Sequence, residues 1–236
     1  RRSSSAASDV YKRQFKYGTN MKFSIDFKKL GFTKEKNIYL ENDGNLAAYF
    51  EYLLNFKNDY KNLIMLTFGT GVGGGIIYNS EIFKGSGNAG EIGRILINEK
   101  SYLEDVISAK AWTKKCQELY EINKETKLSN IFYEEKVGSL LFDRSIDLED
   151  YEKYARDEII QNTSNALISL FELFDNDIFV IGGSMTKSPY DFLPLLDEYI
   201  SKNFEFPNRN FPKIKLSKAR EDSGLLGAAL LALNSE

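Results

Sequence analysis

Apolar residues recur along the chain in short runs and at helical spacing. Short runs predict strands at residues 37–40, 63–66, 76–78, 81–84, 178–181 and 213–216. Helical spacing predicts an amphipathic segment at residues 25–30 and helices at residues 46–56, 102–120, 148–174, 190–203 and from residue 223 onward. Strands and helices therefore alternate, and residues 63–84 contain consecutive antiparallel strands. This order is typical of an α/β fold.

Glycine dominates the connection between the strands at residues 63–66 and 76–78. Five glycines fall within seven residues there: Gly69, Gly71, Gly73, Gly74 and Gly75. Without Cβ atoms, the backbone can bring consecutive N–H groups within hydrogen-bonding distance of an oxyanion such as a phosphate. An ordinary hairpin, the alternative, needs only one or two glycines. We therefore predict a phosphate-binding turn, which is neither a Walker A loop nor a Rossmann fingerprint because a strand follows it.

Polar residues and glycines also follow other predicted strands. Asn42 and Asp43 come after the strand at residues 37–40, with Asn45 as the expected N-cap of the next helix. Gly182 and Gly183 end the strand at residues 178–181. Because ligands of α/β folds bind beyond the carboxyl ends of strands, both positions suit a site. A tight strand-to-helix connection is the alternative for the Gly-Gly pair.

Glu91 lies between glycines, in the sequence Ala89-Gly90-Glu91-Ile92-Gly93-Arg94. Flanking glycines would let the carboxylate approach a polar ligand closely. A surface charge in a glycine-rich turn is the alternative. The position of Glu91 after the predicted phosphate-binding turn favours the ligand-binding interpretation.

Composition narrows the chemistry. The chain has 236 residues, a net charge of −3, one cysteine and no histidine. A Ser-His-Asp triad, a histidine-ligated metal and an internal disulfide are therefore excluded. There is no overall basic field to recruit nucleic acid, and no apolar run reaches the roughly 18 residues of a membrane helix. We expect a cytoplasmic protein.

Residues 1–14, RRSSSAASDVYKRQ, differ in character from the Lys-, Asn- and aromatic-rich sequence that follows. We interpret them as a non-native or disordered leader without a role in the fold. A non-native leader would mean that the natural reading frame is cut upstream of Phe15, so that the chain is a fragment.

Motifs in a fixed order carry a resemblance to the ROK family (repressors, open reading frames and sugar kinases). They are Glu41-Asn42-Asp43-Gly44-Asn45, the Gly69–Gly75 stretch, Ala89-Gly90-Glu91-Ile92-Gly93, Ile181-Gly182-Gly183 and Leu226-Gly227-Ala228-Ala229. Each motif is weak alone, but the ordered set is specific. The resemblance implies an α/β, actin-like ATPase (ribonuclease-H-like) fold with two lobes, the N-terminal one incomplete. We expect the remnant of that lobe at residues 15–57, packed against the helix at 222–234, and the C-terminal lobe at residues 58–221.

The resemblance also implies roles for individual residues. Asp43 resembles the catalytic base, and Asn42, Glu91 and Glu104 resemble sugar ligands. The phosphates of ATP are expected at Gly69, Thr70, Gly71, Gly73 and Gly74, and its adenosine at Gly182 and Gly183. ATP with Mg²⁺ is the expected cofactor, and sugar and ATP are the expected partners, with no nucleic acid bound by this segment. The resemblance also suggests a homodimer.

The chain departs from the family pattern in several places. Arg94 stands where the family has a histidine that binds sugar and zinc, and the Cys-rich zinc loop is absent between Ile97 and Leu103. We therefore predict no zinc, and expect Arg94 to pair with Glu91 or Glu104 or to hydrogen-bond the sugar. The N-terminal Asp-x-Gly-Gly-Thr phosphate motif is also absent, which agrees with truncation. We expect this polypeptide to lack kinase activity by itself.

The sequence therefore favours an ATP-dependent kinase that phosphorylates the 6-hydroxyl of a hexose or an N-acetylhexosamine. Asp43 favours an enzyme, because phosphoryl transfer needs mainly positioning, charge stabilisation and one carboxylate at the nucleophilic hydroxyl. A sugar-sensing repressor with its DNA-binding domain upstream is the alternative from another class. A sugar-binding pseudo-kinase is a third, supported by Arg94 and the missing zinc loop.

Overall fold

A computed structural model describes residues 7–9, 14–17, 25–26, 41–122, 142, 148, 150–183, 192–219 and 222–234. The strands are β1 (Ala7–Asp9), β2 (Gln14–Tyr17), β3 (Ile25–Asp26), β4 (Leu63–Phe68), β5 (Val72–Tyr78), β6 (Glu81–Ile82), β7 (Ile178–Gly182) and β8 (Lys213–Leu216). The helices are α1 (Asp43–Glu51), α2 (Glu104–Ile107), α3 (Ala109–Ile122), α4 (Asp150–Phe174), α5 (Leu193–Asn203) and α6 (Ser223–Leu233). A π-helical turn, η1 (Tyr52–Phe56), extends α1, and η2 (Ile92–Arg94) is a 3₁₀ turn.

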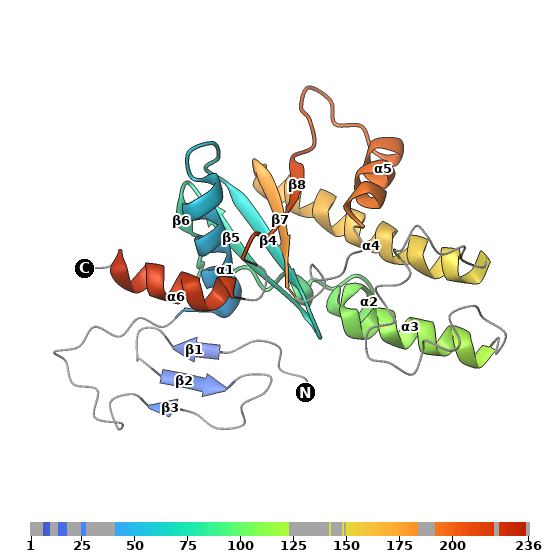
Figure 1. The fold of residues 1–236 in the computed structure, drawn as a ribbon, viewed down its shortest axis with the longest axis horizontal. Helices are drawn as coiled ribbons and strands as arrows, with labels where there is room; N and C mark the ends of the chain where they lie inside the picture. Colours follow the sequence, from blue (N-terminus) through green and yellow to red (C-terminus); the bar gives the residue numbers. More distant parts are fainter. Residues whose placement is uncertain are drawn as a thin grey trace.

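A five-stranded sheet with the order β6-β5-β4-β7-β8 forms the centre of the molecule (Figure 1). β4, β5 and β6 pair antiparallel, as predicted, whereas β4-β7 and β7-β8 are parallel. Thr67 on β4 pairs with Gly182 on β7. The carboxyl ends of these strands, and the glycine motifs that follow them, therefore meet at one edge of the sheet.

Helices cover both faces of this sheet, which explains why β4 and β7 are nearly continuous apolar runs. Leu63, Met65 and Val180 pack with α1 residues Ala47 and Ala48. The alternate residues of the same strands point to the other face, because strand side chains alternate. There Ile64, Leu66, Phe68, Phe179 and Ile181 pack with residues of α3, α4 and α5, including the fully buried Trp112.

The glycine-rich connection differs from the prediction. β5 begins at Val72, so Gly73, Gly74 and Gly75 lie within a strand and only residues 69–71 form the turn. Glycine is needed in this strand for close packing, because a Cβ on Gly75 would lie 2.3 Å from the carbonyl oxygen of Gly44 on α1. The idea of one wide turn containing all five glycines is therefore wrong.

Two predicted helices also have different boundaries. α1 begins earlier, with Asn42 rather than Asn45 as N-cap, because Asn42 Oδ1 accepts hydrogen bonds from Gly44 N (2.8 Å) and Asn45 N (3.2 Å). The helix predicted over residues 102–120 is interrupted at Ser108, whose backbone is extended. The Ser108 hydroxyl accepts a hydrogen bond from Ala111 N (3.1 Å) and so caps α3.

The other elements follow the sequence more closely. α4, α5, β7 and β8 agree with their predicted segments to within a few residues. β1 and the first residue of β2 fall in the leader at residues 1–14, where no secondary structure was predicted, and they form a small sheet with β3. β3 also replaces the start of the amphipathic segment expected at residues 25–30. The strand predicted at residues 37–40 lies outside the described residues.

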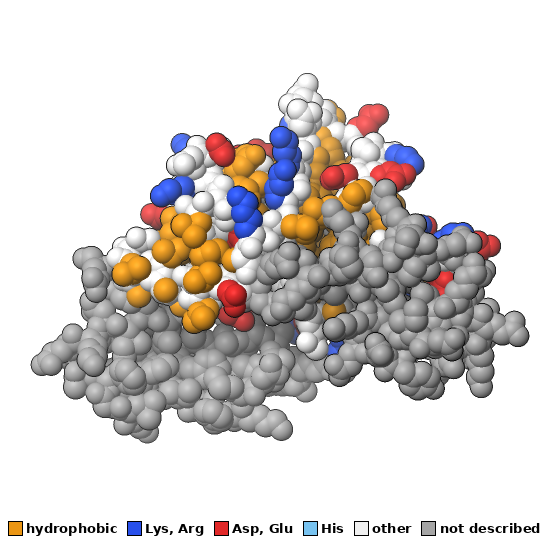
Figure 2. Space-filling view, in the orientation of Figure 1, with side chains coloured by type: hydrophobic (Ala, Val, Ile, Leu, Met, Phe, Trp, Pro, Cys, Tyr) orange, Lys and Arg blue, Asp and Glu red, His pale blue; other side chains and the backbone are white. Residues whose placement is uncertain are grey.

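α6 is an apolar helix that packs on α1. Gly227 faces α1 so closely that a Cβ there would lie 2.0 Å from Leu46 O. The opposite side of α6 leaves Leu225 and Leu233 exposed, and hydrophobic side chains gather over this helix in Figure 2. No helix in the described part of the chain combines the length and apolarity that a membrane span requires.

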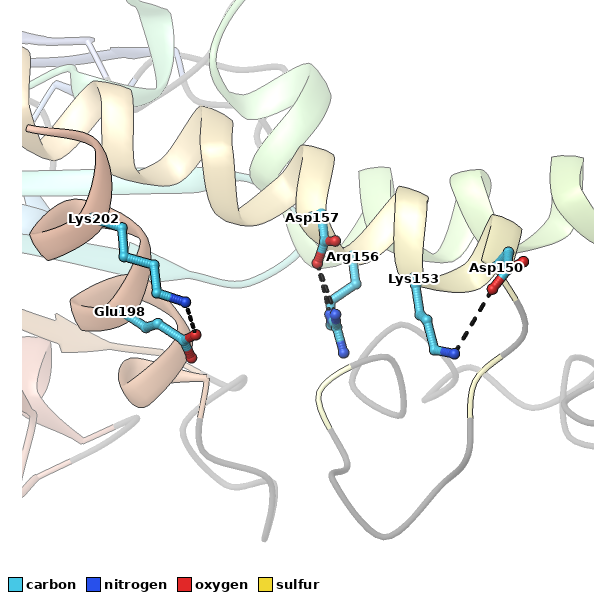
Figure 3. A network of polar contacts seen from close by, with 6 residues as sticks. All are labelled: Asp150, Lys153, Arg156, Asp157, Glu198 and Lys202. Atoms are coloured by element: carbon cyan, nitrogen blue, oxygen red, sulfur yellow. Dashed lines mark hydrogen bonds and ion pairs between the residues drawn. The ribbon is translucent and has the colours of Figure 1, made fainter.

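Charged residues on the outer sides of α4 and α5 form local ion pairs (Figure 3). Lys153 lies 3.8 Å from Asp150, Arg156 lies 2.8 Å from Asp157, and Lys202 lies 2.7 Å from Glu198. Exposed pairs of this kind contribute at most about 1 kcal/mol each. These helices are therefore held by their apolar faces.

Candidate active site

The amino end of α1 presents the first candidate residues. The Oδ1 atom of Asn42 caps the helix by accepting hydrogen bonds from its first turn. The side-chain amide nitrogen is therefore the atom of Asn42 that could donate to a ligand. Asp43 is exposed in the first turn, and its Oδ1 accepts a hydrogen bond from Gly44 N (3.0 Å). A carboxylate at this position is stabilised by the helix dipole. α1 therefore holds an ionisable oxygen at the surface, in a fixed place relative to the sheet.

Close contacts between glycines fix where α1 begins. A Cβ on Gly44 would lie 2.2 Å from Gly74 O, so the first turn of α1 touches the backbone of β5. A side chain on Gly44 would push the helix away from the strand, whereas one on Gly74 would meet Ile92 and the carbonyl oxygen of Gly90. Gly74 was predicted as a phosphate ligand in a turn. It lies instead within β5, where its carbonyl oxygen contacts the first turn of α1, the helix that carries Asp43.

The turn at residues 69–71 joins β4 to β5. Gly69 N donates to Gly71 O (3.0 Å), and Gly69 O accepts from Ala109 N at the start of α3 (3.0 Å). Among the described residues, the N–H groups of Thr70 and Gly71 have no hydrogen-bond acceptor, and Thr70 is exposed. This turn therefore offers neighbouring N–H groups and a hydroxyl to a ligand.

Glu104 and Arg94 lie beside this turn. A Cβ on Gly71 would come 2.9 Å from Glu104 Oε2, and Arg94 Nη1 lies 3.6 Å from Glu104 Oε1. The Arg94 guanidinium also lies over the ring of Tyr102, 3.7 Å from its centroid. The side chains of Arg94 and Glu104 are 28% and 24% exposed, so the pair remains accessible to a ligand. Of the partners expected for Arg94, the structure thus shows Glu104.

Glu91 precedes the 3₁₀ turn η2 and is partly buried. The two residues that follow it pack on β5: Ile92 would touch a Cβ on Gly74, and a Cβ on Gly93 would lie 2.1 Å from Val72 O. These contacts hold the segment containing Glu91 against the same strand that touches α1. Glu91, Glu104 and Asp43 thus all come from segments that contact residues 71–75.

Gly182 and Gly183 lie at the carboxyl end of β7. Gly183 has a positive φ of 92°, and a Cβ there would lie 2.3 Å from Phe68 O. Glycine is therefore required for the chain to pass the end of β4 immediately before the turn at residues 69–71. The structure thus brings the two glycine motifs, which are over a hundred residues apart in sequence, next to each other.

Sequence reasoning missed a buried polar cluster behind Asp43. Glu41, whose side chain is 5% exposed, pairs with Lys84 Nζ (2.7 Å) and accepts hydrogen bonds from Asn42 N (3.1 Å) and Asn45 Nδ2 (2.9 Å). Tyr102, which lies under Arg94, was also missed. The sequence gives no signal that Glu41 and Lys84 are in contact, because their pairing depends on the fold.

A surface pocket of about 900 Å³ lies elsewhere, between α5 and β8. Its lining includes Phe204, Phe206, Phe211 and Lys213. Lys213 is the first residue of β8, so this pocket lies at the amino end of the strand, whereas the candidate site lies at the carboxyl ends. It is therefore separate from the residues described above.

Comparison with protein families identifies a relationship over nearly the whole chain. The ROK family model matches residues 20–235. The N-acetylmannosamine kinase of Haemophilus influenzae is 28% identical over 197 residues, which covers 83% of this chain and 63% of that protein. The chain spans less than two thirds of the length of this and other curated relatives.

Solved structures give the same fold. A ROK family glucokinase from Streptomyces griseus, in complex with glucose and AMPPNP, superimposes with a TM-score of 0.79 at 22% identity, covering 98% of this chain and 80% of that one. A ROK family transcriptional regulator, a homologue of the E. coli MLC protein, has a TM-score of 0.79 at 17% identity, covering 98% of this chain and 60% of that one. The predicted α/β, actin-like ATPase fold is confirmed.

Proposed function

Because the chain belongs to the ROK family, we propose that it is the sugar- and nucleotide-binding part of an ATP-dependent kinase. The kinase would phosphorylate the 6-hydroxyl of a hexose or an N-acetylhexosamine. Two observations carry this proposal. The helix that begins with Asp43 packs on β5 through Gly44, and the turn at residues 69–71 lies beside Glu104 and next to Gly183, at the carboxyl ends of β4 and β7. Relatives named as kinases of glucose and of N-acetylmannosamine support it.

In this proposal, Asp43 is the general base. Its exposed carboxylate would take the proton from the sugar hydroxyl as that oxygen attacks the γ-phosphate. The hydrogen bond that it accepts from Gly44 N would help to orient this carboxylate toward the sugar. The close packing of Gly44 on Gly74 would hold this carboxylate in place during the transfer.

Glu91, Glu104, Arg94 and the Asn42 amide would bind the sugar. Carboxylates accept hydrogen bonds from neighbouring sugar hydroxyls, and a guanidinium donates to a hydroxyl or to an N-acetyl carbonyl. Arg94 would thus take over the ligand role of the family histidine without a metal ion. Its planar group is already oriented by Tyr102 and Glu104.

The nucleotide would bind on the other side of the turn. The N–H groups of Thr70 and Gly71 would face its phosphates, and Gly182 and Gly183 would let adenosine approach the backbone. Within the described residues, His, Cys, Asp and Glu side chains form no group of three that could hold a metal ion. Mg²⁺ would therefore arrive with ATP, held mainly by phosphates and water.

We further propose that the expected lobe division, with residues 15–57 and α6 in one lobe and residues 58–221 in the other, applies to a longer cytoplasmic, homodimeric protein. No Asp-x-Gly-Gly-Thr motif is present in the sequence, so we expect the 236-residue chain to bind ligands without turning over. Adding the upstream sequence of the natural gene should restore activity.

A coupled assay for ADP tests the proposal on the longer protein. The acceptors are glucose, N-acetylmannosamine, N-acetylglucosamine, fructose and mannose, each with MgATP. We expect turnover with at least one sugar and its loss in Asp43→Ala, with the control Asp59→Ala, an exposed aspartate after η1, unchanged. Full turnover by Asp43→Ala would exclude Asp43 as the base.

A sugar-sensing repressor is the second candidate, because a ROK transcriptional regulator has the same fold. The upstream reading frame discriminates between the two: a winged helix would indicate a repressor, and an Asp-x-Gly-Gly-Thr motif a kinase. Sugar binding without turnover and without a DNA-binding domain would indicate a pseudo-kinase.

A further inference from the structure

Glu51 is a fully buried carboxylate that the proposed reaction does not use. It ends α1 and has no exposed surface. Its Oε1 accepts hydrogen bonds from the Ser217 hydroxyl and from Ala219 N (3.1 Å), and its Oε2 accepts one from Asn55 Nδ2 (2.9 Å). Burying a carboxylate is costly unless such donors surround it. Two of these donors come from a segment 166 residues or more away in sequence.

That segment, residues 217–219, follows β8 and touches the nucleotide side of the proposed site. Ser217 N donates to Ile181 O (2.8 Å), and a Cβ on Gly182 would lie 3.2 Å from Ser217 Cβ. Ser217 is 5% exposed, so it fills the space between α1 and the end of β7. The chain of contacts runs from Glu51 to Ser217 and from there to Gly182.

We propose that Glu51 is a positioning residue that couples α1 to the Gly182-Gly183 turn. α1 carries Asp43 at its amino end and Glu51 at its carboxyl end, so one rigid helix connects the proposed base to this turn. Glu51 would thereby set the place of the adenosine-binding backbone relative to Asp43. This inference rests on the proposed function for its ligand and on the contacts above for its mechanism.

Two substitutions distinguish the effect of the hydrogen bonds of Glu51 from the effect of its side-chain volume. Glu51→Gln keeps an Oε1 that can accept from Ser217 and Ala219, while the Asn55 amide rotates to present its oxygen. Glu51→Leu keeps most of the volume and leaves all three donors without this acceptor. We expect the loss to be about tenfold in an equilibrium constant, or about 1.4 kcal/mol.

Calorimetric titration of the 236-residue chain with AMPPNP, and separately with glucose and with N-acetylmannosamine, is the first test. We expect AMPPNP affinity to fall about tenfold in Glu51→Leu and to stay within about twofold in Glu51→Gln, with sugar affinity unchanged in both. Thr163→Val is the matched control, since Thr163 is also fully buried and its hydroxyl donates within α4, to Ile159 O (2.8 Å). It should lower stability without changing AMPPNP affinity.

Hydrogen exchange gives a readout that needs no ligand. The amides of Gly182 and Gly183 should exchange about tenfold faster in Glu51→Leu or Ser217→Ala than in Glu51→Gln or Thr163→Val. Ser217→Ala also replaces Glu51→Leu if that variant does not fold. Unchanged exchange at these glycines in Ser217→Ala, or unchanged AMPPNP affinity in a folded Glu51→Leu chain, would overturn the coupling. A different outcome is possible in which the wild-type protein binds no nucleotide, while Gly182 and Gly183 still exchange faster in Glu51→Leu and Ser217→Ala than in the controls. This result would overturn the proposed function and leave the coupling intact.

Discussion

The carboxylate of Glu104 lies against the backbone of Gly71, so that a Cβ atom on Gly71 would come 2.9 Å from Glu104 Oε2. A residue from α2 thus limits the space beside the turn between β4 and β5. In the proposed kinase, this contact places a sugar ligand next to the phosphate-binding turn. The distance between the acceptor sugar and the nucleotide would then depend on the absence of a side chain at Gly71.

Gly71→Ala should displace Glu104 with little loss of stability. The new methyl group meets the flexible end of a side chain, and Gly71 does not have the left-handed backbone that only glycine adopts readily. We expect the free energy of unfolding in urea to change by less than about 1 kcal/mol, while sugar affinity falls by about tenfold. Thr70→Ala is the control, since it removes a hydroxyl from the same turn without adding volume next to Glu104. Equal sugar affinity in Gly71→Ala and wild type would show that Glu104 does not bind the sugar from this position.

Arg94→Lys tests whether a positive charge is enough at the position of the family histidine. Lysine keeps the charge but loses the planar group that lies over Tyr102 and faces Glu104. We expect sugar affinity to fall by about tenfold or more, since stacking and a directed ion pair each contribute about 0.5–1 kcal/mol and orient the donor. Tyr102→Leu should produce part of the same loss. Retained affinity in both variants would remove Arg94 from the sugar site.

Motif order was enough to predict the fold, but not which contacts the glycines make. The apolar runs of β4 and β7 and the helical spacing of α4 are local signals, and they were correct. Gly73, Gly74 and Gly75 look like a turn in sequence and lie in a strand. Their small size matters because α1 and η2 pack on them, and this is a long-range contact that no local pattern carries.

The candidate site was predictable only where a residue stands in a recognised motif. Asp43, Glu91 and Gly183 were proposed as site residues in this way, and Arg94 was proposed as a departure from the motif. Glu41, Lys84 and Glu51 were not found, because a buried charge is recognisable only when its partners are known. Asn42 caps α1 in place of the expected Asn45, since either asparagine could cap a helix starting near residue 43.

Gly227→Ala and Gly224→Ala form a matched pair on α6. A Cβ on Gly227 would lie 2.0 Å from the carbonyl oxygen of Leu46, whereas one on Gly224 would lie 3.6 Å from Asp43 O. Alanine favours a helix over glycine by about 1 kcal/mol, so Gly224→Ala should be neutral or stabilising. Gly227→Ala should lower the free energy of unfolding by about 1–3 kcal/mol, because backbone must move apart. Urea denaturation followed by circular dichroism measures both. Equal stability of the two variants would mean that α6 does not pack on α1 in solution.

Lys84→Met tests the ion pair behind Asp43. Lys84 lies 2.7 Å from Glu41, whose side chain is 5% exposed, and methionine removes the charge while keeping most of the apolar stem. Removing one partner of a fully buried pair costs about 3–5 kcal/mol, but Lys84 is 46% exposed, so we expect a loss of about 1–2 kcal/mol.

Lys202→Met is the matched control for this change, because Lys202 pairs with Glu198 at the same 2.7 Å and both side chains are more than half exposed. It should cost less than about 0.5 kcal/mol. Urea unfolding in low and high salt measures the difference, and added salt should weaken the Lys202 pair more than the Lys84 pair, because buried charges are screened less. Adding Glu41→Gln to Lys84→Met should recover part of the lost stability, since the neutral amide no longer needs a cation. If Lys84→Met and Lys202→Met have the same small effect at every salt concentration, the Glu41–Lys84 pair stabilises the protein no more than an exposed surface pair does.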